Sequence, residues 1–191
     1  MADDESLANG PVSRGRLLVA TPPLADPNFD RTVILVLEHG GSGSLGLVLN
    51  RPSLTDLGKV LPDWDDVASD PARVFVGGPV SPEAVIALAR GECRDDDGWV
   101  PLFDDLGTVD VGRAPTSIGA RVRGLRIFVG YAGWAPEQLQ GELDAGAWFV
   151  VDALPSDPFV DDPDALWASV LKRQRGRIAI FASCPADPTV N

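Results

Sequence analysis

A short stretch near residue 135 gathers side-chain types that could build a polar site. It contains a phenol, an indole, an amide and a carboxylate, at Tyr131, Trp134, Gln138 and Glu142. The last three are spaced by four residues, so they fall on one helical stripe, and a helix is expected over residues 136–144. Leu139 and Leu143 fall on the adjacent stripe and are expected to face the core. The polar stripe is either a pocket wall or a network that holds the helix to a sheet. The need of buried polar groups for partners favours the network.

The chain has a single histidine, His39, which follows Glu38. A histidine-dependent hydrolase would have to use His39 as its base, but neighbouring side chains on a strand point to opposite faces, so Glu38 cannot pair with it. The chain has no G-x-S-x-G nucleophile elbow. A zinc site would need His39, Cys93, Cys184 and a carboxylate together, and their spacing shows no local pairing of ligands. We expect a histidine at a hairpin end, bonded to backbone, and assign no catalytic or metal-binding residue.

Two arginines, Arg31 and Arg51, stand beside apolar runs, with Asn50 next to the second. If these runs pair as an antiparallel hairpin, both arginines come to the end opposite the turn. Guanidinium groups bind carboxylates and other anions bidentately. The pair either receives an anionic ligand or forms an internal salt bridge with Asp26 or Asp30. Because arginines commonly pair with carboxylates close by, we favour the bridge.

Glycines occur in two groups that resemble ligand-binding turns. Those at 40, 41 and 43 join two apolar runs rather than a strand and a helix, so turn chemistry explains them and a phosphate cradle is not expected. Gly77 and Gly78 follow a short apolar run. Their N–H groups either face a cavity or belong to a tight turn with close backbone packing, which we favour.

These residues must be positioned by strands and a few short helices. The run 32–39 is apolar on both faces, which predicts a buried central strand, and a Gly/Ser turn at 40–44 joins it to the run 45–50 as a hairpin. Further strands are expected at 16–20, 73–76, 99–103, 108–111, 125–131, 148–152 and 178–182. Helices are expected at 55–61, 115–122, 136–144 and 162–173. The segment 85–89 fits either a strand or a helix that begins near Ser81. Since β-α alternation is not regular, the class is α+β.

Composition bounds the kind of protein. The chain has 191 residues, and its 45% of hydrophobic side chains exclude wholesale disorder. We expect one domain over residues 15–185, with a flexible N-terminal tail at 1–14 and a C-terminal tail at 186–191. Sixteen Lys and Arg against 28 Asp and Glu give a net charge of -12, which argues against direct binding of nucleic acid. A local basic cluster at Arg121, Arg123 and Arg126 is interpreted as a solvated face.

Few signals bear on location and assembly. The two cysteines form no C-x-x-C pair, the N-terminus is acidic, and no apolar run approaches the ~20 residues of a membrane span. These features predict a cytoplasmic protein that does not enter a membrane. The residues call for no cofactor, and they leave the oligomeric state open.

Three segments together resemble a known family. They are GRLLVATPPLADPNFDRTVILVLEHGGSGSLGLVLNRP at 15–52, VFVGGPV at 74–80 and IFVGYAGWAPEQLQGELDAGAWFVV at 127–151. Their order and spacing are similar to those of the YqgE/AlgH family of bacterial proteins, a domain of unknown function. The resemblance implies a single α+β domain with a mixed, mostly antiparallel sheet bent into a pseudo-barrel. It also makes 85–89 a strand. Members are often labelled transcriptional regulators, a label that brings neither a DNA-binding motif nor an established reaction.

Three functions remain open at this point. The first, which we favour, is a regulatory module that binds a small molecule or a protein without catalysis. The second is a transcriptional regulator that contacts DNA directly, and the third is an enzyme that uses Glu38 or Glu142 as its acid or base. The candidate residues of the binding pocket or structural network are Arg31, Glu38, His39, Asn50, Arg51, Gly77, Gly78, Tyr131, Trp134, Gln138 and Glu142.

Overall fold

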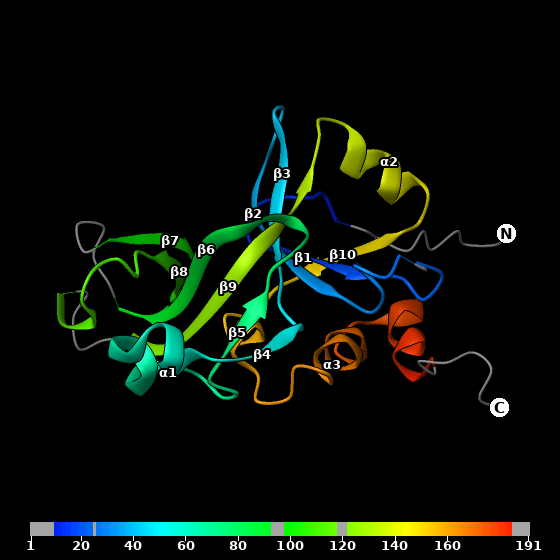
Figure 1. Ribbon diagram of the computed structural model, residues 1–191. Helices are drawn as coiled ribbons and strands as arrows, with labels where there is room; N and C mark the ends of the chain where they lie inside the picture. Colours follow the sequence, from blue (N-terminus) through cyan, green and yellow to red (C-terminus); the bar gives the residue numbers. More distant parts are fainter. Residues whose placement is uncertain (1–9, 25, 93–97, 118–121, 185–191) are drawn as a thin grey trace, which may run out of the picture.

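Ten strands in the described part of the chain form one curled sheet, with short helices against its faces (Figure 1). The computed structural model describes residues 10–24, 26–92, 98–117 and 122–184. The strands are β1 (Arg16–Ala20), β2 (Val33–Gly40), β3 (Gly43–Val48), β4 (Pro52–Asp56), β5 (Arg73–Val76), β6 (Val80–Gly91), β7 (Trp99–Phe103), β8 (Leu106–Val109), β9 (Val122–Trp134) and β10 (Trp148–Asp152). The sheet curls into a half-barrel, so the predicted α+β class is confirmed.

The long strand β9 connects the two halves of the sheet. The main path runs β10-β1-β2-β3-β9-β6-β8-β7, and all its pairs are antiparallel. One edge of β9 pairs with β6. The other edge pairs in parallel with β5 and then, at its end, with β3. The sheet is therefore mixed and mostly antiparallel, as predicted, and β9 carries side chains to two distant regions of the molecule.

The sheet is covered on both faces, which explains its apolar strands. In β1, Leu17 and Val19 belong to the largest apolar cluster, whereas Leu18 and Ala20 belong to a second cluster on the opposite face. A strand buried on both faces loses the usual alternation of apolar and polar residues. This is the condition of β2, whose first five residues are all buried. The predicted central strand is confirmed.

The helical elements are short and pack against the faces and ends of the sheet. They are α1 (Leu57–Val60), α2 (Gln138–Asp144) and α3 (Leu166–Lys172), with 3-10 turns η1 (Pro62–Val67), η2 (Pro115–Ser117), η3 (Asp157–Phe159) and η4 (Gly176–Ser183). Figure 1 shows α2 beside the tip of the β2–β3 hairpin, and α3 and η4 at the other end of the molecule. None of the helices in the described ranges is long and apolar enough to cross a lipid bilayer.

Strand pairing decides the conformation of two segments for which the local sequence was ambiguous or favoured a helix. The segment 85–89 lies within β6, because residues 85–91 pair with β9, and no helix begins at Ser81. This outcome agrees with the family resemblance. The helix expected at 55–61 begins only at Leu57, since the residues before it form β4 against β5.

The expected final strand at 178–182 is wrong. This run lies in the 3-10 turn η4, where Ile178 is buried and Phe181 packs against Phe149 in a tilted arrangement with 5.4 Å between ring centroids. A short apolar run can bury itself against a sheet face as well as along a sheet edge. By contrast, the amphipathic segment 162–173 does contain α3, although the helix starts only at residue 166.

Some expectations concern residues outside the described ranges. They involve Cys93, Arg121, part of the helix expected at 115–122, most of the tail at 1–14 and the whole tail at 186–191. The described part of the tail, residues 10–14, leads directly into β1. There, Nη2 of Arg14 donates a hydrogen bond to the carbonyl oxygen of Pro101 in β7 at 2.6 Å. This residue therefore links the segment before β1 to β7, the last strand of the sheet path.

Candidate functional site

The β2–β3 hairpin turns more tightly than the sequence predicts. Gly40 pairs directly with Gly43, so only Gly41 and Ser42 form the turn, and the five-residue turn expected at 40–44 is wrong. Gly43 has a φ of +120°, and a Cβ there would lie 2.3 Å from the carbonyl oxygen of the last residue of β9. Only glycine accepts both this backbone conformation and this close approach.

One row of side chains crosses three strands at this tip. His39 lies opposite Ser44, and Ser44 lies opposite Trp134 of β9. Directly opposite residues share a face of the sheet, and a hydrogen bond of 2.8 Å joins Nδ1 of His39 to Oγ of Ser44. The expected bond from His39 to backbone is thus replaced by a side-chain pair. Glu38 lies opposite Leu45 and faces the other side, as predicted.

A pocket of about 260 Å³ opens beside this row. Its lining includes Glu38, His39, Ser42, Ser44, Leu45 and Trp134. Three of the residues that the sequence nominated for binding therefore border one cavity. Glu38 and His39 are exposed, whereas Trp134 is only 5% exposed. The pocket thus has a polar, accessible rim beside a buried indole.

A carboxylate on α2 collects N–H groups behind this pocket. Oε2 of Glu142 accepts hydrogen bonds from Nε1 of Trp134 at 2.9 Å and from Nε1 of Trp148 at 2.8 Å. Its Oε1 accepts from Nε2 of Gln138 at 3.0 Å. Oε2 therefore holds α2 to β9 and β10, whereas Oε1 forms a bond within the helix. This supports the structural network for Gln138 and Glu142, whereas Trp134 belongs both to the network and to the pocket lining.

The sequence found this network for a partly wrong reason. Trp134 ends β9 and does not belong to the helix, so it shares no helical stripe with Gln138 and Glu142. The short connection at residues 135–137 turns the chain so that α2 lies beside the indole of Trp134. The pair within the helix does follow the four-residue spacing. As predicted, Leu139 is buried and packs with the second apolar cluster.

The sequence analysis missed Trp148 and the role of Ser44. Trp148 is 1% exposed, and its ring lies 6.0 Å from that of Trp134 and 5.6 Å from that of Phe29, centroid to centroid. A buried indole N–H needs a hydrogen-bond acceptor. This requirement could have predicted that Trp148 bonds to a nearby carboxylate. Ser44 was assigned to a turn, and only the exact hairpin register places it opposite the histidine.

The other end of the hairpin is closed by backbone contacts. Oδ1 of Asn50 accepts from the N–H of Val33 at 3.0 Å, and its Nδ2 donates to the carbonyl oxygen of Arg31 at 2.9 Å. The guanidinium of Arg31 donates to the carbonyl oxygen of Cys184 at 2.5 Å and lies 4.4 Å from the ring centroid of Trp167. Asn50 therefore closes this end of the hairpin, and Arg31 ties it to α3 and to the residue after η4.

The salt bridge expected at this end does not form among the described residues. Arg51 donates to the carbonyl oxygen of Asp30, and more weakly to that of Asn50 at 3.4 Å. The carboxylate of Asp26 instead accepts the N–H of Asn28 at 2.8 Å. Arg31 and Arg51 do come to the same end, as predicted, but their guanidinium groups bind carbonyl oxygens.

Gly77 and Gly78 serve close packing of the backbone. The N–H of Gly77 donates to the carbonyl oxygen of Val129, and its own carbonyl accepts from the N–H of Val48, both at 2.8 Å. A Cβ at Gly78 would lie 2.2 Å from the carbonyl carbon of Tyr131. These contacts support the tight-turn interpretation. Tyr131 itself is half-buried and packs against the largest apolar cluster.

The basic cluster that the sequence assigns to solvent contains a buried cation. Arg126 on β9 is only 1% exposed, and its guanidinium lies 4.2 Å from the ring centroid of Phe75. Burial lowers the pKa of Arg126 to about 10, so the group still carries its charge at neutral pH. The solvated interpretation is therefore wrong for this residue, because the strand passes beneath two covering loops.

The row at the hairpin tip can exchange hydrogen bonds with a polar ligand. A hydroxyl beside an imidazole is also the start of a nucleophile–base pair, which normally needs a third group to orient the base. In the described part of the chain, the only side chain hydrogen-bonded to the His39 ring is Ser44. Nor do the described residues contain three or more His, Cys, Asp or Glu side chains grouped to hold a metal ion.

Comparison with known proteins finds one family. The AlgH-like family model matches residues 17–179. A UPF0301 protein from Streptomyces coelicolor is 49% identical over 183 residues, covering 93% of this chain and 94% of that protein. A UPF0301 protein from Mycobacterium leprae is 44% identical over 184 residues, covering 94% of this chain and 91% of that protein.

Solved structures share the same fold. Protein DIP2367 from Corynebacterium diphtheriae superposes with a TM-score of 0.84 at 30% identity, over 92% of this chain and 94% of that one. The solution structure of the AlgH protein from Pseudomonas aeruginosa superposes with a TM-score of 0.64 at 26% identity, over 97% of both chains. The three sequence segments, the curled sheet and these matches agree. The chain belongs to the AlgH-like family, which includes the UPF0301 proteins.

Proposed function

We propose that this chain is a regulatory module that binds a small polar molecule or a protein partner without catalysis, through the pocket at the tip of the β2–β3 hairpin. One observation carries the proposal. The His39–Ser44 pair stands at the rim of a 260 Å³ pocket, exposed on one side and backed by Trp134. Exposed hairpin ends on a rigid sheet are common positions for binding residues.

The neighbouring carboxylates support binding more than catalysis. Glu142 uses both oxygens on N–H donors of its own chain, and these bonds occupy three of the about four acceptor positions of a carboxylate. Glu38 is exposed and lies on the face opposite His39. A general base is most effective when a second group holds it in place and its surroundings tune its pKa.

Charge supports a ligand other than nucleic acid. The chain carries a net charge of -12. Affinity for DNA comes largely from neutralising phosphates with Lys and Arg, and it is strongest at low salt. We therefore expect no complex with duplex DNA at about 50 mM salt, where electrostatic binding is near its strongest. A complex at that salt that includes the hairpin tip would revive direct regulation on DNA.

The proposal is tested by native mass spectrometry of the untagged chain purified gently from its own cells. We expect a bound small molecule, or a co-purified protein, in the wild type. His39→Ala and Ser44→Ala should lose this species, while Ser156→Ala, an exposed serine whose hydroxyl makes no hydrogen bond among the described residues, should keep it. The proposal fails if the wild type carries neither species, or if the two tip variants retain it fully.

A further inference from the structure

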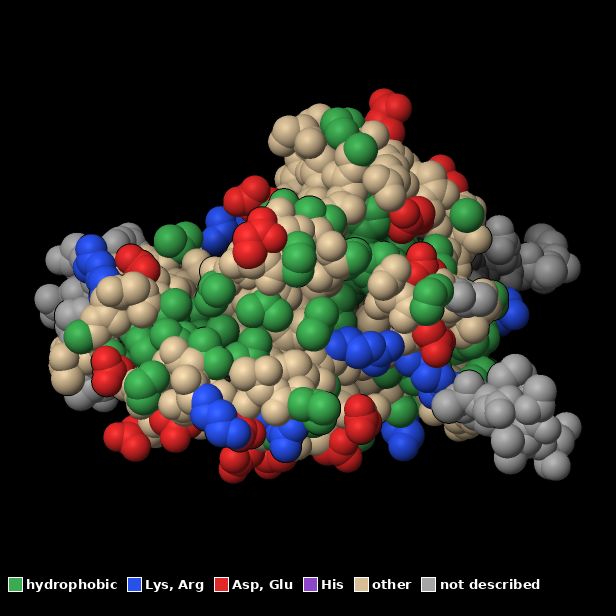
Figure 2. Space-filling view, viewed as in Figure 1, with side chains coloured by type: hydrophobic (Ala, Val, Ile, Leu, Met, Phe, Trp, Pro, Cys, Tyr) green, Lys and Arg blue, Asp and Glu red, His purple; other side chains and the backbone are tan. Residues whose placement is uncertain are grey.

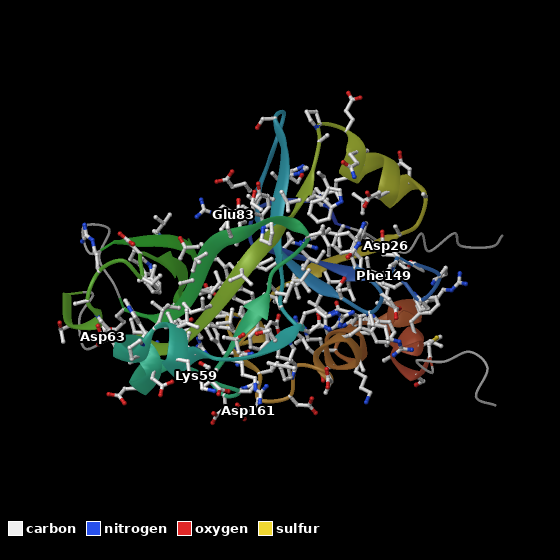
Figure 3. All side chains as sticks on the ribbon, in the orientation of Figure 1. Asp26, Lys59, Asp63, Glu83, Phe149 and Asp161 are labelled. Atoms are coloured by element: carbon white, nitrogen blue, oxygen red, sulfur yellow. The ribbon has the colours of Figure 1, made fainter. Side chains whose placement is uncertain are left out.

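A second pocket lies at the other end of β9, far from the hairpin tip. It has a volume of about 470 Å³, within the range of about 300–1,000 Å³ usual for small-molecule sites. Its lining includes Ser69, Asp70, Arg90, Arg123, Phe159 and Asp161. Figure 3 places Asp161 at the lower edge of the molecule, and Figure 2 shows acidic and basic side chains interspersed along that edge.

The buried Arg126 holds two walls of this pocket together. Its Nη2 donates to the carbonyl oxygens of Asp70 and, at 3.4 Å, of Ser69, and its Nη1 donates to that of Val160 at 3.3 Å. The loop before β5 and the loop after η3 are therefore fastened to β9 by one side chain. A pocket whose walls are fixed in this way is already formed before any ligand arrives.

A second ionic cluster fixes the two arginines that line the pocket. Arg90 donates to both carboxylate oxygens of Asp105, at 2.9 Å from Nη2 and at 3.2 and 3.3 Å from Nε, and Arg123 donates to Oδ2 at 2.9 Å. Two guanidinium groups thus share one carboxylate, which leaves this cluster with an excess positive charge. The remaining N–H groups of Arg90 and Arg123 have no partner among the described residues.

The same pocket is also lined by two carboxylates. Asp70 and Asp161 are exposed, and both attract the buried guanidinium of Arg126 without a direct ion-pair contact among the described residues. Gly124 also lines the pocket, and a Cβ there would come 2.8 Å from Oγ of Ser69 and 3.7 Å from the ring of Phe159, so the chain is closely packed at this point. The pocket lining therefore combines cationic, anionic and aromatic side chains within one cavity.

We propose that this pocket binds a small zwitterion, an α-amino acid with an apolar side chain. Its carboxylate pairs with Arg90 and Arg123, its ammonium group with Asp70 and Asp161, and its side chain contacts Phe159. A dianion such as phosphate meets repulsion from two carboxylates, and a polyamine meets repulsion from two guanidinium groups. A molecule with both charges satisfies both the basic and the acidic side chains, and guanidinium groups bind a carboxylate through paired N–H donors.

The test uses four matched probes on the whole chain, with backbone amide NMR shifts as the readout. The probes are L-leucine, 4-methylpentanoate, which lacks the ammonium group, 3-methylbutylamine, which lacks the carboxylate, and inorganic phosphate. We expect L-leucine to shift the amides of Ser69 and Gly124 in a saturable way. Each of the other three should bind at least about tenfold more weakly, the effect of about 1.4 kcal/mol.

Variants with matched controls test whether the basic and the acidic side chains of the pocket each contribute to binding. Arg123→Gln and Asp161→Asn change exposed side chains, so the fold is kept, and each should weaken L-leucine by about tenfold or more. Arg175→Gln and Asp164→Asn change exposed residues outside the pocket lining and should bind as the wild type does. Neither result depends on the hairpin-tip site, which His39→Ala reports separately.

Three outcomes overturn the proposal. One is no shift at about 10 mM L-leucine, a concentration at which even a weak site is filled. Another is equal binding of L-leucine and of either truncated probe, which would show that only the basic or only the acidic side chains matter. The third is tighter binding of phosphate than of L-leucine, which would make this a simple anion site.

Discussion

Two regions along β9 each contain a charged side chain that is hydrogen-bonded to neutral groups, but the charges have opposite signs. Near the C-terminal end, the carboxylate of Glu142 meets three side-chain N–H groups. In the other half of the strand, the guanidinium of Arg126 meets three backbone carbonyl oxygens. Figure 1 shows how far apart these regions lie along the strand.

The difference lies in how distant in sequence the partners are. The donors to Glu142 come from residues four, six and eight positions away, within one strand–helix–strand unit. The acceptors of Arg126 lie 34 to 57 positions away, in two separate loops. A local network holds one helix to the sheet, whereas a long-range one fastens distant segments. We therefore expect the second region to matter more for the stability of the whole fold.

Removing the buried guanidinium of Arg126 is expected to cause the largest loss of stability. Arg126→Ala leaves three carbonyl oxygens without their donor and opens space above Phe75. Each unsatisfied buried polar group costs about 1–3 kcal/mol, offset by the relief of a buried charge, so we expect a net loss of about 3 kcal/mol in the free energy of unfolding. Urea denaturation measures this, with the exposed Arg123→Ala as control, expected to change stability by less than about 1 kcal/mol. Equal effects of the two variants would contradict the special role of burial.

Neutralising the carboxylate at the other end should have a smaller effect. Glu142→Gln keeps the size of the side chain but turns one acceptor into a donor that faces other donors. Hydrogen bonds to a charged group contribute about 1.5–3 kcal/mol, and one acceptor remains, so we expect a loss of about 1.5 kcal/mol. Tryptophan fluorescence during urea unfolding measures this loss, since Trp134 and Trp148 are two of the five tryptophans of the chain. Gln138→Ala, which removes an exposed donor, should cost about 0.5 kcal/mol; a larger loss than from Glu142→Gln would show that the indole bonds contribute little.

The smallest effect concerns the ion pairs beside Arg126. The hydrogen bond from Arg90 holds the pKa of Asp105 below its usual value. A lowered folded-state pKa adds stability that is present above the unfolded pKa of about 3.9 and is lost as pH falls through the folded value. The stability difference between wild type and Asp105→Asn should therefore be constant above about pH 5, below about 1 kcal/mol, and should shrink below about pH 4. A difference that grows on acidification would reverse the assigned direction.

Much of the fold was available from patterns of near neighbours in the sequence. The strands β1, β5, β7 and β10 begin and end where the sequence placed them. Apolar runs and turn residues act locally, so a short window contains their signal. The three family segments added the half-barrel and the strand at 85–89, which local patterns left ambiguous.

The side-chain contacts in the sites are only partly predictable from local sequence patterns. Four-residue spacing correctly joined Gln138 to Glu142, and it placed Trp134 nearby although that residue is on a strand. The hydrogen bond between Trp148 and Glu142 depends on how the chain returns from α2 into β10. A rule based on residue spacing within one helix cannot predict this contact. The pairing of His39 with Ser44 depends on a turn of two residues rather than five.

The sequence by itself determined the class, the family and the residues able to form hydrogen bonds. Only the tertiary structure decided which of those residues are buried and which partners they have. Arg126 is the clearest case, because its neighbours in sequence indicate a solvated arginine, and its burial comes from loops that cross it after folding. Burial and long-range pairing depend on the whole chain closing on itself, so a local window of sequence cannot contain them.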